Sequence, residues 1–165
     1  MRTIDKNTVV EAVAALCMEA NRFLPADVLA AFARAKAAES SAAAREVFNQ
    51  LEENAALAKE TGLPLCQDCG LGVFFVEVGE DVRLAGGGLR EAINEGMVKG
   101  YQDGFLRKST CDPFSRKNVG DNSPAIVHFD LVPGDRLKIT MMAKGGGSEN
   151  MSRVMMLAPA QGWKG

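Results

Sequence analysis

The chain has 165 residues, a length that suits one domain with a hydrophobic core better than two. Its composition of 47% hydrophobic and 24% charged residues is typical of a globular protein, and its net charge of −2 argues against nucleic acid as the main partner. No apolar run approaches the roughly 20 residues that span a bilayer, and residues 1–13 lack the apolar core of a signal peptide, so we expect a cytoplasmic protein without a membrane span.

The first helix is predicted from a capping signal followed by an apolar stripe. Thr8 and Glu11 have the spacing of a capping box, in which each side chain bonds the backbone of the other residue. An apolar face follows at helical spacing, made of Val9, Val10, Val13, Leu16 and Cys17. Because free cysteine buries readily, we interpret Cys17 as a core residue.

Two more helices are expected before the chain changes character. The second opens at Pro25, a favourable first-turn residue. It is expected to bury three side chains: Val28, Leu29 and Phe32. The third starts near Ser41 and stops at Gly62, because glycine readily takes the left-handed conformation that ends helices.

The pattern then switches to a strand and back to a helix. Residues 72–79 form a β-branched and aromatic run between glycines, which predicts a buried strand. Residues 88–106 predict a helix along which three glycines recur at spacing four: Gly96, Gly100 and Gly104. Each glycine costs about 1 kcal/mol relative to alanine inside a helix, so three in register indicate close packing of another backbone.

After a polar loop at 108–123, two strands are predicted at 124–131 and 135–143. The Pro133-Gly134 turn between them predicts a hairpin. The single histidine, His128, falls on the more polar face of its strand, and we interpret it as a structural or surface residue. The order of elements predicts an α+β fold: an N-terminal helical layer, then a small mixed sheet with the glycine-rich helix packed on it.

The stretch LPLCQDCG contains the chain's one close pair of thiols, Cys66 and Cys69. A structural zinc site needs about four protein ligands, and beyond this pair the chain offers only Cys17, Cys111 and His128. A thioredoxin-like dithiol follows a strand and opens a helix, whereas this pair follows a helix and leads into a strand. A turn with two partly buried thiols is a third alternative, and the pair alone does not decide between them.

Two further patterns are compatible with anion binding. Four cations fall within eleven residues that contain one acid, Asp112, and they fit either solvated loop charge or a local anion site: Arg107, Lys108, Arg116 and Lys117. The glycine triplet 145–147 follows a predicted strand, where free amides can bind an anion. A plain loop explains the triplet equally well.

Together these segments resemble the N-terminal part of class I fumarate hydratase, the iron–sulfur hydro-lyase family that also contains L-tartrate dehydratase. In chain order the matching segments are Cys66–Asp68, GYQDGFLRKS (100–109), DPFSRKNVGDNSPAIVHFDLVPGDRLKI (112–139) and AKGGGSENMS (143–152). The resemblance covers about residues 7–165. Its most specific parts are the matches around RKN–GDN and KGGGS.

The resemblance implies a hydro-lyase that hydrates fumarate to L-malate reversibly, or alternatively L-tartrate dehydratase, with a 4Fe–4S cluster held by three cysteines. Cys66 matches the first cluster ligand. The positions that match substrate-binding residues are Gln67, Asp68, Arg107, Gly146 and Gly147. Asp68 is in addition placed to orient water or carry its proton, as a catalytic residue.

The sequence departs from the family pattern in two respects. Cys69 stands where the family usually has threonine, so it is not expected to be a ligand. The other two ligand cysteines of the family lie beyond the matching segment. Residues 1–165 are therefore expected to be one truncated N-terminal domain of the α-subunit type, whose partners are a β subunit or β-like domain and, in an oligomer, further subunits. A noncatalytic CxxC metal-binding or redox module is the alternative from another class.

Overall fold

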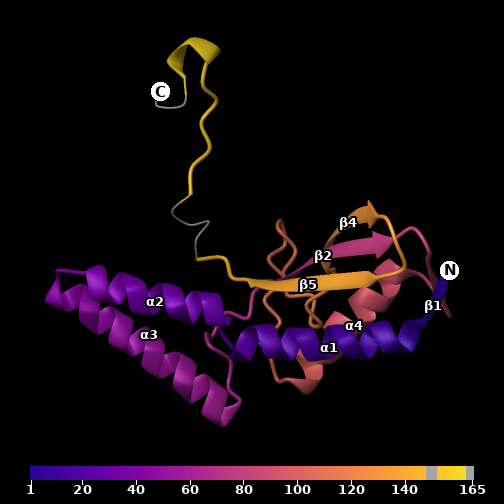
Figure 1. The fold of residues 1–165 in the computed structure, drawn as a ribbon, viewed down its shortest axis with the longest axis horizontal. Coiled ribbons are helices and arrows are strands. Elements are labelled where there is room, and N and C mark those ends of the chain that lie inside the picture. The colour runs from indigo at the N-terminus through magenta and orange to yellow at the C-terminus, as the bar shows by residue number, and fades with distance from the viewer. Residues whose placement is uncertain (148–151, 163–165) are drawn as a thin grey trace.

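The computed structural model describes residues 1–147 and 152–162, and it confirms the α+β fold (Figure 1). Within these residues the helices and strands are β1 (Arg2–Asp5), α1 (Lys6–Arg22), α2 (Ala26–Ala38), α3 (Ala42–Thr61), β2 (Leu71–Gly79), β3 (Val82–Ala85), α4 (Leu89–Asp103), β4 (Ile126–Val132), β5 (Leu137–Lys144) and the 3-10 helix η2 (Pro159–Gln161). None of the helices in the described ranges is long and apolar enough to cross a membrane.

Helix α1 is present as predicted, but its cap differs. The Asp5 carboxylate caps the helix by accepting from the Asn7 N–H at 2.8 Å, so the helix begins before Thr8 and the Thr8–Glu11 capping box is wrong. The predicted core face is confirmed at Val9, Val13 and Cys17, whereas Val10 and Leu16 are only half-buried. The other buried residues of the helix are Ala14 and Asn21. Burial raises the pKa of the Cys17 thiol to about 12, which suits a neutral core residue.

Helices α2 and α3 lie against each other and extend away from the sheet (Figure 1). The predicted ends of α3 are confirmed, because Ser41 caps its start and Gly62, at φ +72°, ends it. The predicted burial in α2 is wrong: none of its residues is buried, and Leu29 is 42% exposed. The pair makes its own small contact, an edge-to-face packing of Phe32 on Phe48, instead of covering the sheet.

The glycine-rich helix α4 packs closely along α1, as the glycine spacing predicts. A Cβ at Gly96 would lie 2.6 Å from the Val10 carbonyl oxygen, and one at Gly100 would lie 2.6 Å from that of Ala14. Side chains at these positions would separate the two backbones. Beside the glycines, α4 contributes four fully buried side chains to the core: Ala92, Ile93, Met97 and Tyr101.

We therefore expect Gly100→Ala to destabilise the protein although alanine favours a helix. Overpacking at a backbone contact costs ~1–3 kcal/mol, which exceeds the helix-propensity gain of about 1 kcal/mol. Urea unfolding should show a lower midpoint at unchanged slope. Gln102→Ala, at an exposed position of the same helix, is the control and should leave the midpoint nearly unchanged. A Gly100→Ala protein as stable as this control would contradict the packing argument.

The three-stranded sheet has the order β4-β2-β5, so the predicted hairpin of the last two strands is wrong. Strand β2 lies between them and pairs with β4 in parallel and with β5 antiparallel. The connection at 133–136 crosses the end of β2, where Gly79 N–H donates to Arg136 O at 2.8 Å. Four residues span up to about 13 Å, enough to bridge two interstrand spacings of roughly 4.8 Å each. A Pro-Gly turn signal does not distinguish this crossing from a hairpin.

Strand β2 is central because its inner side chains, Phe74 and Val76, are buried against α4 and the rest of the core. On the outer face of the sheet His128 is exposed and stacks on Phe75 with 5.2 Å between ring centroids, which confirms it as a surface residue.

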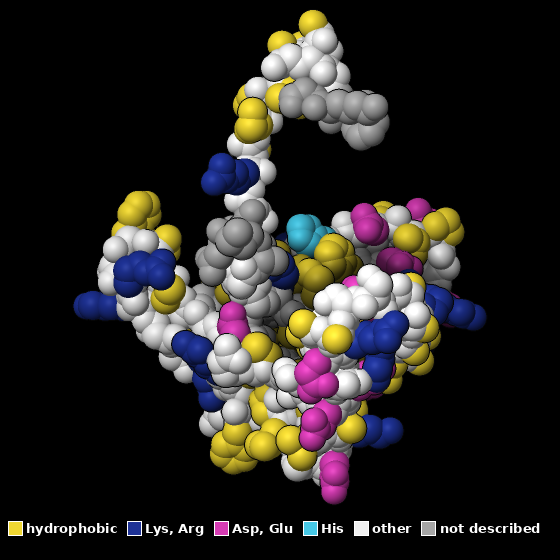
Figure 2. Space-filling model, turned by 90° about the vertical axis from the view of Figure 1, so that its left-hand side faces the viewer, with side chains coloured by type: hydrophobic (Ala, Val, Ile, Leu, Met, Phe, Trp, Pro, Cys, Tyr) yellow, Lys and Arg dark blue, Asp and Glu magenta, His cyan; other side chains and the backbone are white. Residues whose placement is uncertain are grey.

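The pair β1–β3, parallel and four residues long, was not predicted. The C-terminal segment 152–162 stands away from the body and exposes hydrophobic side chains (Figure 2). Met156, for example, is 94% exposed.

Candidate functional site

A cleft of about 640 Å³ lies where three connecting segments meet: the loop that leads from α3 into β2, the segment after α4, and the end of β5. Its lining residues are Gln67, Asp68, Gly70, Leu71, Arg107, Ser109, Lys144, Gly145, Gly146 and Gly147. All five positions that the sequence assigned to substrate binding are among them. The structure thus brings these residues together, whereas their roles stay predictions.

The loop that carries Cys66–Asp68 is held by hydrogen bonds to two helices, α4 and α1. The buried Tyr101 hydroxyl of α4 donates to Cys69 O at 2.8 Å, and Leu65 N–H donates to Asn21 O of α1 at 2.8 Å. Gly70 has φ +65°, and a Cβ there would collide with the Lys144–Gly145 backbone. Glycine is therefore needed for the loop to lie directly against the end of β5.

Three hydrogen bonds hold the Asp68 carboxylate. Oδ2 accepts from Gly146 N–H at 3.0 Å, while Oδ1 accepts from the Ser109 hydroxyl at 2.9 Å and from Gly70 N–H at 3.1 Å. The Gly146 and Ser109 bonds, with a smaller contribution from the Arg107 charge, lower the pKa of Asp68 below its ordinary value. The carboxylate is therefore an ionised acceptor. Among the described residues Oδ2 has one donor, Gly146 N–H, which leaves this oxygen the capacity to accept a further hydrogen bond.

The two thiols of the CxxC pair differ in their surroundings. Cys66 is exposed beside the cleft, where its thiol donates to Gln67 Oε1 at 3.3 Å and Asp68 N–H points to its sulfur at 3.5 Å. Cys69 is 2% exposed, and its sulfur accepts from Arg107 N–H at 3.3 Å. Burial raises the pKa of the Cys69 thiol. An open thiol suits a metal ligand and a buried, bonded one suits a loop anchor.

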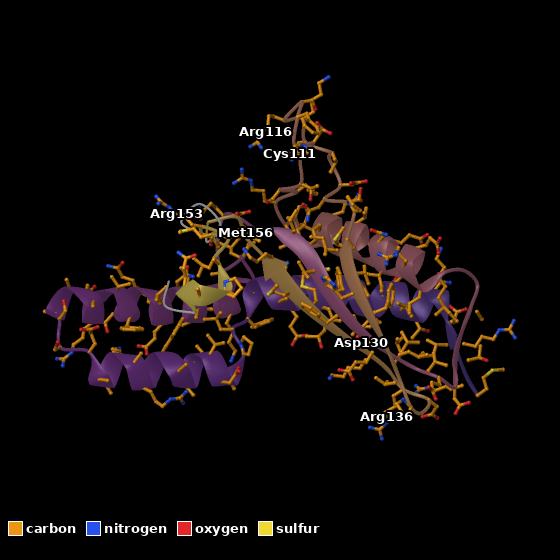
Figure 3. All side chains as sticks on the ribbon, turned by 90° about the horizontal axis from the view of Figure 1, so that it is seen from above. Cys111, Arg116, Asp130, Arg136, Arg153 and Met156 are labelled. Carbon is orange, nitrogen blue, oxygen red and sulfur yellow. The ribbon has the colours of Figure 1, made fainter. Side chains whose placement is uncertain are left out.

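The basic cluster does not act as one unit. Arg107 lines the cleft, whereas Arg116 lies on the loop that projects from the body near Cys111 (Figure 3). Lys144, at the end of β5, is the second cation of the cleft lining. Among the residues that the structure describes, the cleft lining carries two cations, Arg107 and Lys144, and one carboxylate, that of Asp68, a composition compatible with an anionic ligand.

Sequence reasoning missed three residues that shape this cleft: Ser109, Asn122 and Lys144. All three belong to segments of the family resemblance, Asn122 to its GDN match, but the residue types of Ser109 and Lys144 are common in any loop. Asn122 is fully buried and follows a Gly-Asp pair, a sequence that also signals an ordinary turn. No pattern in the sequence pointed to its burial.

The donor set fits one ligand of an iron–sulfur cluster. Cys66 offers an accessible sulfur with a backbone N–H directed at it, the kind of bond that tunes cluster sulfurs. Within residues 1–147 and 152–162 there is no group of three histidine, cysteine or acidic side chains that could hold a metal ion. A complete site would need ligands from outside the described residues.

Known proteins that are similar to this chain belong to one family. A family model described as fumarate hydratase (Fumerase) matches residues 10–165. The chain is 36% identical over 163 residues to a putative L(+)-tartrate dehydratase subunit alpha of Methanocaldococcus jannaschii, covering 95% of this chain and 57% of that protein. It is 31% identical over 166 residues to an L(+)-tartrate dehydratase subunit alpha of Escherichia coli, covering 96% and 54%.

A putative class I fumarate hydratase of Geobacillus stearothermophilus is 31% identical over 144 residues, covering 85% of this chain and 28% of that protein. The chain spans about half the length of the tartrate dehydratase subunits that it matches. Because the family match extends over nearly the whole chain and includes every segment of the cleft, this protein belongs to the class I fumarate hydratase family.

Proposed function

We propose that the complete protein is an iron–sulfur-dependent hydro-lyase that adds water to fumarate, and removes it from L-malate, in the cleft described above. The observation that carries the proposal is the meeting of Gln67, Asp68 and Arg107 with the glycine loop 145–147 in one cleft of about 640 Å³. This volume is in the usual range for small-molecule sites, about 300–1,000 Å³. The cations Arg107 and Lys144 among its described lining residues suit a dianion.

Each residue has a role that follows from its chemistry. The Arg107 guanidinium binds one carboxylate of the diacid through two parallel N–H bonds, which its planar fork matches. Gln67 bonds a substrate oxygen without adding charge. Asp68, oriented by its three donors, accepts a hydrogen bond from the hydroxyl or water through its remaining lone pair.

The glycine loop leaves space at the cleft. Gly146 and Gly147 line the cleft, and within the described residues a Cβ at either position would meet no atom within 4 Å, so glycine leaves open space there. We expect glycine at these positions to admit a small diacid that larger residues would exclude.

Cys66 would hold one iron of a 4Fe–4S cluster, and the remaining cysteine ligands would come from residues outside those described. When bound, the cluster supplies a Lewis acid that polarises substrate oxygens and favours departure of the hydroxyl. The matched relatives are named as alpha subunits, and we infer that a β subunit or β-like domain completes the active site.

L-tartrate is the second candidate substrate, because relatives matched over 95–96% of this chain are named as tartrate dehydratase subunits. L-malate and L-tartrate are both four-carbon hydroxy diacids that differ by one hydroxyl. The cleft residues bind carboxylates and one hydroxyl, which the two substrates share. The choice between them therefore depends on the whole protein.

The test is an anaerobic assay of the complete protein, with its β partner, on L-malate, fumarate and L-tartrate. We expect a cluster-dependent interconversion of fumarate and L-malate that is lost after exposure to air and restored by iron and a reductant. Preferred turnover of L-tartrate would support the second candidate. A protein that binds zinc or forms a reversible Cys66–Cys69 disulfide, with no activity on any diacid, would support a noncatalytic module instead.

A further inference from the structure

Asn122 is a buried polar side chain placed where two of the cleft segments meet. Its exposed fraction is 0%, and every polar atom of the side chain is bonded. Oδ1 accepts from Ser109 N–H at 2.7 Å, from Thr110 N–H at 3.0 Å and from the Thr110 hydroxyl at 3.0 Å. Nδ2 donates to Gly70 O at 3.0 Å. The site needs an acceptor on one side and a donor on the other, and an uncharged amide supplies both.

These bonds join segments that are far apart in the sequence. Gly70 ends the loop that carries Cys66, Gln67 and Asp68, whereas Ser109 follows Arg107 by two residues. Asn122 therefore fixes the position of the Arg107 segment relative to the Asp68 loop. A buried hydrogen bond of this kind is costly to leave unmade, so the two segments keep their positions relative to each other.

Ser109 extends the connection into the cleft. Its backbone is fixed by Asn122, and its hydroxyl donates to Asp68 Oδ1 at 2.9 Å. The other oxygen of Asp68 accepts from Gly146 N–H at 3.0 Å. The result is a continuous series of hydrogen bonds from the protein interior to the glycine loop: Asn122, Ser109, Asp68 and Gly146.

We propose that Ser109 and Asn122 are positioning residues, which hold the Asp68 carboxylate in the orientation that binds Gly146 and presents its free lone pair to the cleft. Neither residue acts on the substrate directly in this role. The catalytic consequence rests on the proposed hydro-lyase function, but the effect on the glycine loop does not.

Ser109→Ala in the complete protein tests the proposal, because it removes one hydroxyl at a half-buried position and leaves the fold in place. Loss of a hydrogen bond to a charged group should lower kcat roughly 10- to 100-fold with a smaller change in KM. Hydrogen exchange over Gly145–Gly147 should become faster, since Gly146 N–H loses a fixed acceptor. Ser109→Thr keeps the hydroxyl and should restore most of both quantities.

Ser123→Ala is the matched control. It removes the same kind of bond, from a serine hydroxyl to the exposed Asp121 carboxylate at 2.7 Å, outside the cleft. It should leave kcat and the exchange over Gly145–Gly147 at wild-type values. Asn122→Ala should act in the same direction as Ser109→Ala, with the iron content measured alongside to exclude unfolding.

Two results would overturn the proposal. One is wild-type exchange over Gly145–Gly147 in Ser109→Ala, which would mean that the hydroxyl does not order the loop. The other is faster exchange with an unchanged kcat, which would make the bond structural only. A wild-type protein inactive on all three diacids would instead refute the proposed function. The hydrogen-exchange measurement alone would then test whether the Ser109 hydroxyl orders the glycine loop through Asp68.

Discussion

Replacing Cys66 with serine in the complete protein is expected to abolish binding of the proposed iron–sulfur cluster. Iron in such clusters is held by thiolate, and a serine hydroxyl is a much poorer ligand. Cys66 is the thiol that the structure leaves open beside the cleft. After anaerobic reconstitution, the iron and sulfide content and the visible absorbance of the variant should fall to background, and activity with them.

Cys69→Thr is the matched control, and it should keep the cluster and most of the activity. The Cys69 sulfur accepts from Arg107 N–H and contacts Cys66 O at 4.0 Å, and a threonine hydroxyl can accept and donate at the same two places. Cys69 is buried, and a threonine side chain has a volume similar to that of cysteine, so the substitution should fit this position. Cluster loss in Cys69→Thr together with retention in Cys66→Ser would reverse the assignment of the two thiols.

The elements that could be predicted from sequence are those set by local rules. Gly62 ends α3 because a left-handed residue is needed there, and the spacing of Gly96 and Gly100 marks the face on which α4 approaches α1. The cleft residues were predictable for a different reason. Their motifs are long and specific, so the family resemblance by itself predicts that Asp68 and Arg107 belong to one site.

The parts that could not be predicted depend on contacts distant in sequence. The order β4-β2-β5 depends on the position of β2, which precedes both partner strands by more than forty residues. The apolar run of β2 would fit any central strand, so it does not indicate which strands become its neighbours. Helix α2 packs mainly on α3 and buries none of its residues, although its apolar side chains would equally suit a core. Asn122 has partners in two separate segments, and no local pattern reports them.

Replacing Arg107 with alanine is expected to reduce catalytic efficiency strongly without loss of the cluster. The change would remove the proposed charge-assisted, bidentate contact and leave a substrate carboxylate unpaired, which should cost ~2–5 kcal/mol in the transition state, or roughly 30- to 5,000-fold in kcat/KM. Arg107→Lys should recover only part of this, because an ammonium group does not reproduce the planar fork. Steady-state kinetics on the complete protein, with iron content measured on the same samples, provide the test.

Arg116→Ala separates this specific contact from a general effect of loop charge. Arg116 belongs to the same basic run but lies on the projecting loop and does not line the cleft (Figure 3). Its removal changes the net charge by the same amount, and exposed charges beyond a Debye length of about 8 Å are largely screened at physiological salt. We therefore expect kcat/KM to stay within about twofold of wild type, a shift worth about 0.4 kcal/mol. Equal losses in the Arg107 and Arg116 variants, at full iron content, would mean that the basic run attracts the diacid as a diffuse field and that Arg107 makes no bidentate contact.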